Sequence, residues 1–288
     1  MTVTFRLRVL TAIAGFWAGQ ALACGEPSHY DVSCLTGGYA YTISGSAVDP
    51  LSGSTTQIAE AGRLTADGAG NLTGIDTVAV AGSTIRRTFT GYYAVNPDGS
   101  GSLVLDPSWG PQIHAGFFAG QNARILRLII TDPGNTLSGV LEAQQPAATA
   151  TAGSGFSVAS LQGGYDYGMA GSATDDFGNV NPIREVGSLV ADGSGTLTGA
   201  STVSVNGSVI QRTLTGAYQI NPDGSGFATL YPSWGPPIDI DLFLSGNGLA
   251  VVFVVTDPGN TLSGSVSAGA PPAWPGVPVL RAAGERMK

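Results

Sequence analysis

Short runs in which apolar and polar residues alternate fill most of the chain, and glycine-rich turns separate them. Alternation with a period of two places every second side chain on the same face of a β-strand, and no run shows the period of a helix. Eight such runs make up the first half. They cover residues 38–47, 57–66, 71–80, 84–95, 101–105, 113–119, 124–131 and 136–142. The pattern therefore predicts an all-β fold.

The turns between these runs indicate how the strands pair. Clusters of Gly, Asn and Asp, such as residues 67–70 and 96–100, supply the positive φ angles that tight hairpins need. A parallel connection would require a dozen or more residues, whereas every link is hairpin-short except the loop over residues 48–56. We therefore expect an antiparallel meander of eight strands that closes into a barrel, which removes the exposed sheet edges. A barrel of this size can fill its interior with side chains or hold one small molecule.

The chain contains this unit twice. Residues 62–139 align without a gap on residues 187–264 at a constant offset of 125, and more than half of the aligned positions are identical. Each copy is long enough to form its own domain, so the sequence predicts two tandem eight-stranded antiparallel up-and-down barrels. The expected organisation is a signal peptide (1–23), an N-terminal segment (24–36), a first barrel (37–143), a linker (144–160), a second barrel (161–268) and a proline-rich tail (269–288).

The N-terminus has the features of an export signal. Arg6 and Arg8 precede an apolar run over residues 9–17, and Ala21-Leu22-Ala23 matches the small residues that signal peptidase recognises. We expect an exported protein that is periplasmic or secreted. No later apolar stretch reaches the roughly 18 residues of a membrane-spanning helix.

Two cysteines stand close together just after this signal. Outside the cytosol, Cys24 and Cys34 most simply form a disulfide, and this is the bond that we predict. The alternative is a lipidated Cys24 that anchors the protein to a membrane. The residue three positions before such a cysteine is usually Leu, whereas this chain has Ala21 there, so the disulfide is favoured.

Charge excludes one class of partner. The formal net charge is −8, and only 12 residues are Lys or Arg. A chain so poor in cations cannot neutralise a run of phosphates, so we expect no nucleic acid partner and no binding to an anionic membrane surface.

A few charged side chains fall on the apolar faces of strands. Arg87 alternates with Ile85 and Phe89, and Glu60 alternates with Leu64. Because an unpaired buried charge is costly, we predict that Glu60 pairs with Arg87, and that the second copy repeats the pair. Two interpretations remain open. The pair either anchors a ligand in the barrel mouth or, the favoured reading, closes one barrel end and fixes the register of its strands.

Aromatic residues accompany these pairs in both copies. Trp109 and Trp234 lie in identical Pro-Ser-Trp-Gly-Pro loops, where an indole can stack on a ligand or, the favoured reading, cover the barrel end. Tyr93 lies on the same strand face as Arg87. The candidate ligand-binding residues are Glu60, Arg87, Tyr93 and Trp109 with their counterparts Glu185, Arg212, Tyr218 and Trp234.

Catalytic residues are scarce. The two histidines are His29 and His114, and the residue that matches His114 in the second copy is Asp239, so no histidine is shared by the copies. We therefore predict that neither copy contains a catalytic residue, a metal site or a cofactor. A site confined to the first copy, around His114 and Asp106, remains open.

Several short motifs resemble those of a known family. They are the opening Leu35-Thr36-Gly37-Gly38-Tyr39, the Ala66-Asp67-Gly68 turn that leads into Leu72-Thr73-Gly74, and the Gly91-x-Tyr93 strand before an Asp-Gly-Ser-Gly turn. These motifs resemble the strand and turn pattern of calycin barrels, the group that includes avidins and lipocalins. The whole chain also resembles tandem Gly-rich repeats of uncharacterised secreted bacterial proteins. No ligand-binding residue of avidins matches this chain position by position.

The expected function is binding without catalysis. Each barrel would hold one small, mostly apolar molecule, or its loops would contact a partner at the cell surface or outside the cell. One alternative is a structural or adhesive spacer with plugged barrels. Another is a single outer-membrane barrel built from all sixteen strands, which the strand lengths and the export signal permit.

Overall fold

The computed structural model describes residues 29–48, 51–120, 122–144, 155–175 and 177–269, which form sixteen β-strands and three short 3₁₀ turns. The predicted signal peptide, the partner Cys24 of the predicted disulfide, and most of the predicted linker and tail lie outside these residues. No helix in the described ranges has the length and apolarity needed to cross a membrane.

The first copy folds as predicted into a closed antiparallel meander, in which each strand pairs with the next and the last strand pairs with the first. Its strands are β1 (Thr36–Val48), β2 (Thr55–Asp67), β3 (Asn71–Val80), β4 (Ser83–Val95), β5 (Ser100–Pro107), β6 (Ile113–Gly120), β7 (Ile125–Ile130) and β8 (Asn135–Gln144). Several strands extend one or two residues past their predicted ends because the ladder hydrogen bonds continue up to the turns.

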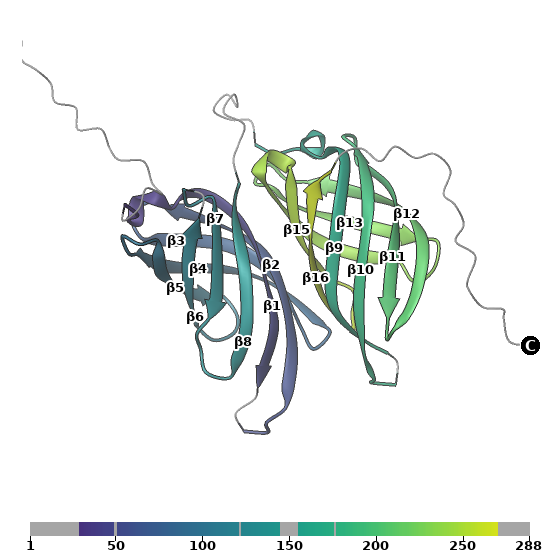
Figure 1. Ribbon diagram of the computed structural model, residues 1–288, viewed down its shortest axis with the longest axis horizontal. Helices are drawn as coiled ribbons and strands as arrows, with labels where there is room; N and C mark the ends of the chain where they lie inside the picture. The colour runs from purple at the N-terminus through teal and green to yellow at the C-terminus, as the bar shows by residue number, and fades with distance from the viewer. Residues whose placement is uncertain (1–28, 49–50, 121, 145–154, 176, 270–288) are drawn as a thin grey trace, which may run out of the picture.

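The second copy closes into its own barrel (Figure 1), so the expectation of a single sixteen-stranded barrel is wrong. Its strands are β9 (Gln162–Thr174), β10 (Val180–Asp192), β11 (Thr196–Val205), β12 (Ser208–Ile220), β13 (Ser225–Pro232), β14 (Ile238–Ser245), β15 (Ala250–Val255) and β16 (Asn260–Ala268). Each copy pairs all its strands internally because hairpin-length connections bring consecutive strands together before any distant strand can compete.

Large side chains fill the interior of the first barrel. Tyr41, Phe117 and Leu126 are almost completely buried among the apolar residues of the other strands. The hollow between Tyr41, Leu64 and Leu103 measures about 10 Å³, which is barely room for one water molecule. The interior is therefore a packed core and not a ligand chamber.

A short 3₁₀ turn is attached to one end of each barrel. The turns are η1 (Val32–Cys34) and η2 (Val158–Ser160), and each precedes the first strand of its barrel. The hydroxyl of Tyr93 lies 2.8 Å from the carbonyl oxygen of Leu35, and that of Tyr218 lies 2.7 Å from the carbonyl oxygen of Leu161. These tyrosines bind their own chain and hold the turns in place.

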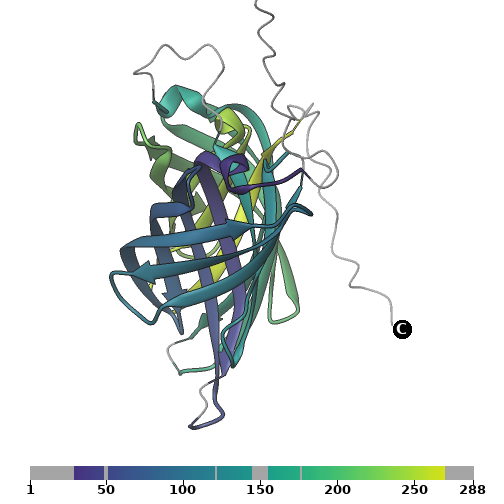
Figure 2. The same ribbon diagram turned by 90° about the vertical axis from the view of Figure 1, so that its left-hand side faces the viewer.

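The two barrels pack directly against each other, which the sequence did not predict. They lie side by side in Figure 1, and in Figure 2 the first barrel lies in front of the second. Strands β1 to β3 contribute four buried alanines, and β14 and β15 contribute three larger apolar side chains. This interface core consists of Ala40, Ala59, Ala61, Ala79, Phe243, Val252 and Val254. Small side chains on one side allow the two sheets to approach closely, as close packing of the contact requires.

Charged side chains surround this apolar contact. The Arg86 guanidinium binds both carboxylate oxygens of Asp241 at 2.6 and 2.8 Å, and the Thr77 hydroxyl donates to the same carboxylate at 2.7 Å. Arg63 of the first barrel lies 2.6 Å from Asp223 of the second. Two-point binding by a guanidinium sets orientation as well as attraction, so the barrels have a defined mutual position.

We expect Ala79→Leu to destabilise the protein by about 1–3 kcal/mol, because the added carbons have no space between the two sheets. Urea unfolding measures this loss. Ser204→Leu is the matched control, since Ser204 occupies the same position in the second barrel and is partly exposed. Its expected effect is within about 0.5 kcal/mol. Equal losses for the two variants would show that the barrel contact contributes nothing to stability.

Candidate functional site

A row of direct cross-strand neighbours runs through the wall of the first barrel. Tyr41 faces Gly62, Gly62 faces Asp76, and Asp76 faces Arg87 on successive strands β1 to β4. A Cβ atom at Gly62 would lie 2.7 Å from the Cβ atom of Asp76 and 2.8 Å from the Tyr41 ring. The glycine therefore leaves the space through which the tyrosine reaches the charged side chains.

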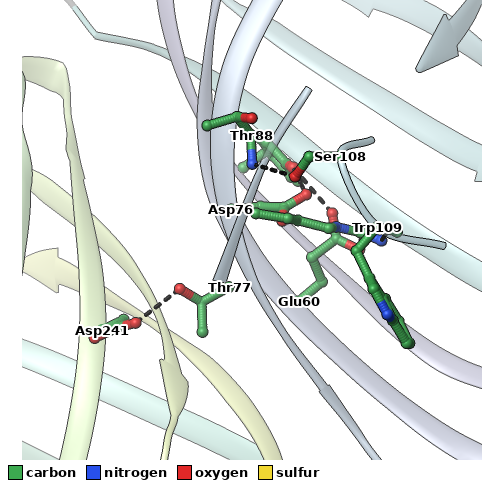
Figure 3. Close-up of polar contacts among 9 residues, drawn as sticks. Glu60, Asp76, Thr77, Thr88, Ser108, Trp109 and Asp241 are labelled. Carbon is green, nitrogen blue, oxygen red and sulfur yellow. Dashed lines mark hydrogen bonds and ion pairs between the residues drawn. The ribbon is translucent and has the colours of Figure 1, made fainter. Parts of the chain in front are cut away.

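These side chains form one buried cluster with Glu60 (Figure 3). The Arg87 guanidinium lies 3.0 Å from Glu60 and 2.8 Å from Asp76, and the Tyr41 hydroxyl lies 2.9 Å from Glu60 and 3.0 Å from Asp76. The predicted pair of Glu60 with Arg87 is confirmed. Each carboxylate contacts both the guanidinium and the phenol, which gives every charged group a buried partner.

The second barrel repeats the cluster with one change. The Arg212 guanidinium lies 2.6 Å from Glu185, which confirms the second predicted pair, and the Tyr167 hydroxyl donates to Glu185 at 2.7 Å. Ser201 stands where the first barrel has Asp76, and its hydroxyl lies 3.3 Å from the Arg212 guanidinium. The first cluster thus holds two carboxyl groups for one guanidinium, and the second holds one for one.

Burial and crowding alter the acidity of the first cluster. Burial is the main cause that raises the pKa of Glu60 to about 8, the Asp76 carboxylate raises it further, and the Arg87 guanidinium opposes the rise. Burial also raises the pKa of Tyr41 well above its ordinary value, with smaller contributions from Glu60 and Asp76. A proton on Glu60 leaves one carboxylate opposite one guanidinium, so the buried charge is balanced at neutral pH.

Sequence reasoning missed Tyr41 and Asp76. The signal for Asp76 was present, because it alternates with Leu72, Gly74 and Val78 on the inward face of β3. Only the register shows that it stands directly across from Arg87.

The tryptophan loops contact the clusters through their backbones. The carbonyl oxygen of Trp109 accepts from Arg87 at 3.4 Å, and that of Trp234 accepts from Arg212 at 3.1 Å. The side chains of Trp109 and Trp234 are 56% and 53% exposed, and the indole of Trp109 extends away from the cluster in Figure 3. Each indole is therefore half-exposed and is not buried inside its barrel.

Tyr93 and Tyr218 do not join the clusters. Each lies six residues farther along its strand than the arginine, which corresponds to about 20 Å. Both bind the 3₁₀ turns at the other end of the strand.

His114 lies on the outer surface of the first barrel. Its ring nitrogen Nδ1 is 2.7 Å from the Asp132 carboxylate, and its backbone N–H donates to the same carboxylate at 2.8 Å. The partner is therefore Asp132, whereas Asp106 stands across from Thr90 on another strand pair. Among the described residues, no three His, Cys, Asp or Glu side chains come close enough to hold a metal ion.

Each cluster borders a cleft on the outside of its barrel. Strand β4 pairs with β5 only from Phe89 onward. The first half of β4 therefore has no partner strand on the side where Ser108 lies. A cleft of about 550 Å³ begins there and extends to the second barrel. We call it the inter-barrel cleft, and it is lined by Ile75, Asp76, Thr77, Arg86, Arg87, Thr88, Ser108, Asn221, Ser225, Gly226, Phe227, Asp241 and Phe243.

The second barrel has a corresponding hollow of about 720 Å³, which we call the outer cleft. Seven lining residues of the inter-barrel cleft recur here at the offset of 125. They are Ala200, Ser201, Thr202, Gln211, Arg212, Thr213 and Ser233. The two clefts are therefore equivalent sites, of which the first is completed by the neighbouring barrel and the second is open to solvent.

The raised pKa of Glu60 predicts a pH-dependent stability. The folded protein holds the proton on Glu60 more tightly than the unfolded chain does. The stabilisation that this proton provides is therefore complete below the ordinary pKa of 4.5, and it is lost as the pH rises toward about 8. We expect Asp76→Ser, which copies the second barrel, to make this decrease shallower by about 1 kcal/mol or more. Urea unfolding across this pH range measures it. Ser201→Asp should steepen the decrease, and identical profiles for the three proteins would contradict the assignment.

A second prediction concerns the Glu185–Arg212 pair. We expect Arg212→Met to cost about 3–5 kcal/mol, because it leaves the Glu185 carboxyl buried without its cation. The double variant with Glu185→Met should recover most of this loss, since two apolar side chains of similar volume need no partner. Chemical denaturation measures both. A loss below about 1 kcal/mol for Arg212→Met would mean that the pair is not structurally important.

Comparisons with known proteins assign the chain to no family. No protein-family model matches the sequence, and no curated protein matches it. Among solved structures, the chain is similar to a Nitrosomonas europaea protein named ATTH, with 10% identity, 81% of this chain and 92% of that chain covered, and a TM-score of 0.27. It is also similar to kievitone hydratase from Nectria haematococca, with 9% identity and a TM-score of 0.29. That match covers 86% of this chain and 97% of the hydratase chain.

Proposed function

We propose that this is an exported, non-catalytic binding protein whose small ligands occupy the two clefts outside the barrels. The observation that carries the proposal is the difference in volume between these clefts and the interior of the first barrel. The clefts measure about 550 and 720 Å³, whereas the hollow inside the first barrel measures about 10 Å³. Sites for small molecules are usually concave and about 300–1,000 Å³ in volume, which the clefts match and the interior does not.

The lining of the inter-barrel cleft favours a ligand with both apolar and polar parts. Phe227 offers a half-exposed aromatic ring, and Arg86 offers an exposed guanidinium that is already oriented by Asp241. Thr88 and Ser108 add groups that can form hydrogen bonds at the edge of the first barrel. An aromatic surface with a few fixed polar groups recognises a compact molecule that carries hydroxyl or amide groups.

The lining of the outer cleft is less charged. Gln211 replaces Arg86 at the equivalent position, and Val186 provides an exposed apolar surface. The buried arginine of each barrel is fully engaged by its own cluster, so it positions the wall and is not free to hold an anion. The exposed charge in this lining is the Asp166 carboxylate, so we expect the outer cleft to prefer a neutral or cationic ligand.

A structural or adhesive role is the second candidate. It is favoured by the filled interior of the first barrel and by the packing of the two barrels, which together make a stiff module. Export forms part of both proposals and rests on the N-terminal signal, whereas a bacterial source rests on the resemblance to tandem Gly-rich repeats of secreted bacterial proteins.

Two matched variants test the binding proposal. Thr88→Trp fills the inter-barrel cleft, and Thr213→Trp fills the outer cleft, while both exposed positions leave the buried clusters intact. The wild-type chain and both variants are screened by thermal shift against sugars, lipids, haem and small amides. A true ligand at a hundredfold its Kd stabilises by about 2.7 kcal/mol. We expect the variant whose tryptophan fills the ligand's cleft to lose this stabilisation. The variant whose tryptophan fills the other cleft should keep it unchanged.

Two results would contradict binding in the clefts. One is the absence of stabilisation by any compound in these diverse sets, which would favour the structural role. The other is stabilisation that persists in the double variant, which would place the ligand outside both clefts.

A further inference from the structure

The contact between the two barrels uses different faces of the same repeated unit. The first barrel contributes mainly the outer side of β1 to β4, and the second contributes mainly the outer side of β14 and β15, with further contacts from β8 and β16 at the border. We call these the alanine face and the aromatic face. Because each barrel is a copy of the other, the second barrel also has an equivalent of the alanine face, and the first has an equivalent of the aromatic face on β6 and β7. A contact between unlike faces leaves one of each kind unused at the two ends.

The unused faces carry the two separate halves of the inter-barrel cleft. The outer cleft on the second barrel corresponds to the half that the first barrel supplies. A hollow of about 500 Å³ on the first barrel corresponds to the other half. Its residues Asn96, Ser100, Gly101, Ser102, Gly116 and Phe118 match Asn221, Ser225, Gly226, Phe227, Asp241 and Phe243 at the offset of 125.

Apolar side chains are exposed on both unused faces. Phe118 and Ile129 stand where Phe243 and Val254 stand in the buried contact, and they are 68% and 58% exposed. Val186 stands where Ala61 does and is 63% exposed. Neighbouring large apolar side chains with this much exposure mark a surface that another protein covers.

The charges on the unused faces differ from those at the buried contact. Both members of the Arg86–Asp241 pair are replaced, by Gln211 on one face and Gly116 on the other. In the Arg63–Asp223 pair only the cation is replaced, since Ser188 takes the position of Arg63 and Asp98 takes that of Asp223. A new cation, Arg127, takes the position of Val252.

A new anion appears on the opposite unused face. Asp166 takes the position of Ala40, at an offset of 126 because the loop before β10 is one residue shorter than the loop before β2. Ala40 and Val252 belong to the same buried cluster, so their exposed counterparts Asp166 and Arg127 would meet across an equivalent contact. Arg184 replaces Ala59 on this face, and its guanidinium donates to its own barrel at the carbonyl oxygens of Gly171 and Ile183.

We propose that chains associate head to tail, with the aromatic face of the first barrel in one copy covering the alanine face of the second barrel in the next. The junction pairs Arg127 with Asp166 and joins the two half-clefts into a site equivalent to the inter-barrel cleft. Val186 and Arg184 are larger than the alanines that they replace, so the sheets meet less closely and the contact is weaker than the one within a chain. Repetition of a contact between unlike faces produces a ring or an open filament.

A charge swap tests the proposal on the full-length mature chain. Arg127→Asp and Asp166→Arg each place like charges at the junction. Sedimentation velocity from micromolar to millimolar protein should show concentration-dependent oligomers for the wild-type chain and about tenfold weaker association for each variant alone. An equimolar mixture of the two variants should regain association, because the carboxylate introduced at position 127 of one chain then meets the guanidinium introduced at position 166 of the other. Recovery in the mixture also shows that both variants are folded.

Three outcomes would overturn the proposal. A wild-type chain that stays monomeric over the whole range shows that these faces do not bind a second copy. Oligomers of unchanged strength in both single variants show that copies meet through another surface. A mixture that stays as weak as its components shows that Arg127 and Asp166 do not meet. None of these results depends on a ligand in the clefts, so the proposed binding function can stand or fall separately.

Discussion

An arginine that points into a barrel core needs a carboxylate within reach, and this requirement organises each half of the molecule. The guanidinium of Arg87 is held by Glu60 and Asp76 on two other strands, and the phenol of Tyr41 joins both acids from a third. A shift of any of these strands by one residue would turn its polar side chain outward and leave the others buried and unpaired. The cluster therefore specifies the register of four strands at once.

The filled interior determines where function can reside. A ligand inside each barrel was expected from the sequence, but tyrosine, phenylalanine and leucine side chains occupy this interior in the first barrel. The usable hollows lie where a strand loses its partner beside the Pro-Ser-Trp-Gly-Pro loop, next to the clusters but outside the wall. The same arginine that stabilises the core also shapes the wall of the cleft through the carbonyl of the loop tryptophan.

Duplication followed by divergence gave the two copies different surroundings. Alanines at positions 40, 59, 61 and 79 allow close contact of two sheets, and the same positions in the second barrel carry Asp, Arg, Val and Ser. Inside the barrels, Ser201 stands in place of Asp76, which changes the charge of the cluster while the contact between arginine and glutamate is kept. The barrels are thus alike in backbone and unlike in the surfaces and acids that decide binding.

The sequence by itself determined the strands, their consecutive pairing, the duplication and the inward direction of Glu60 and Arg87, because these follow from local alternation and from turns of hairpin length. The same alternation on β3 also held the signal for Asp76, although that residue was not predicted. The filling of the barrel, the meeting of Asp76 with Arg87, the backbone role of Trp109 and the contact between the barrels were decided only by the tertiary structure. They depend on the stagger of distant strands and on the fit of surfaces, and neither leaves a periodic trace along the chain.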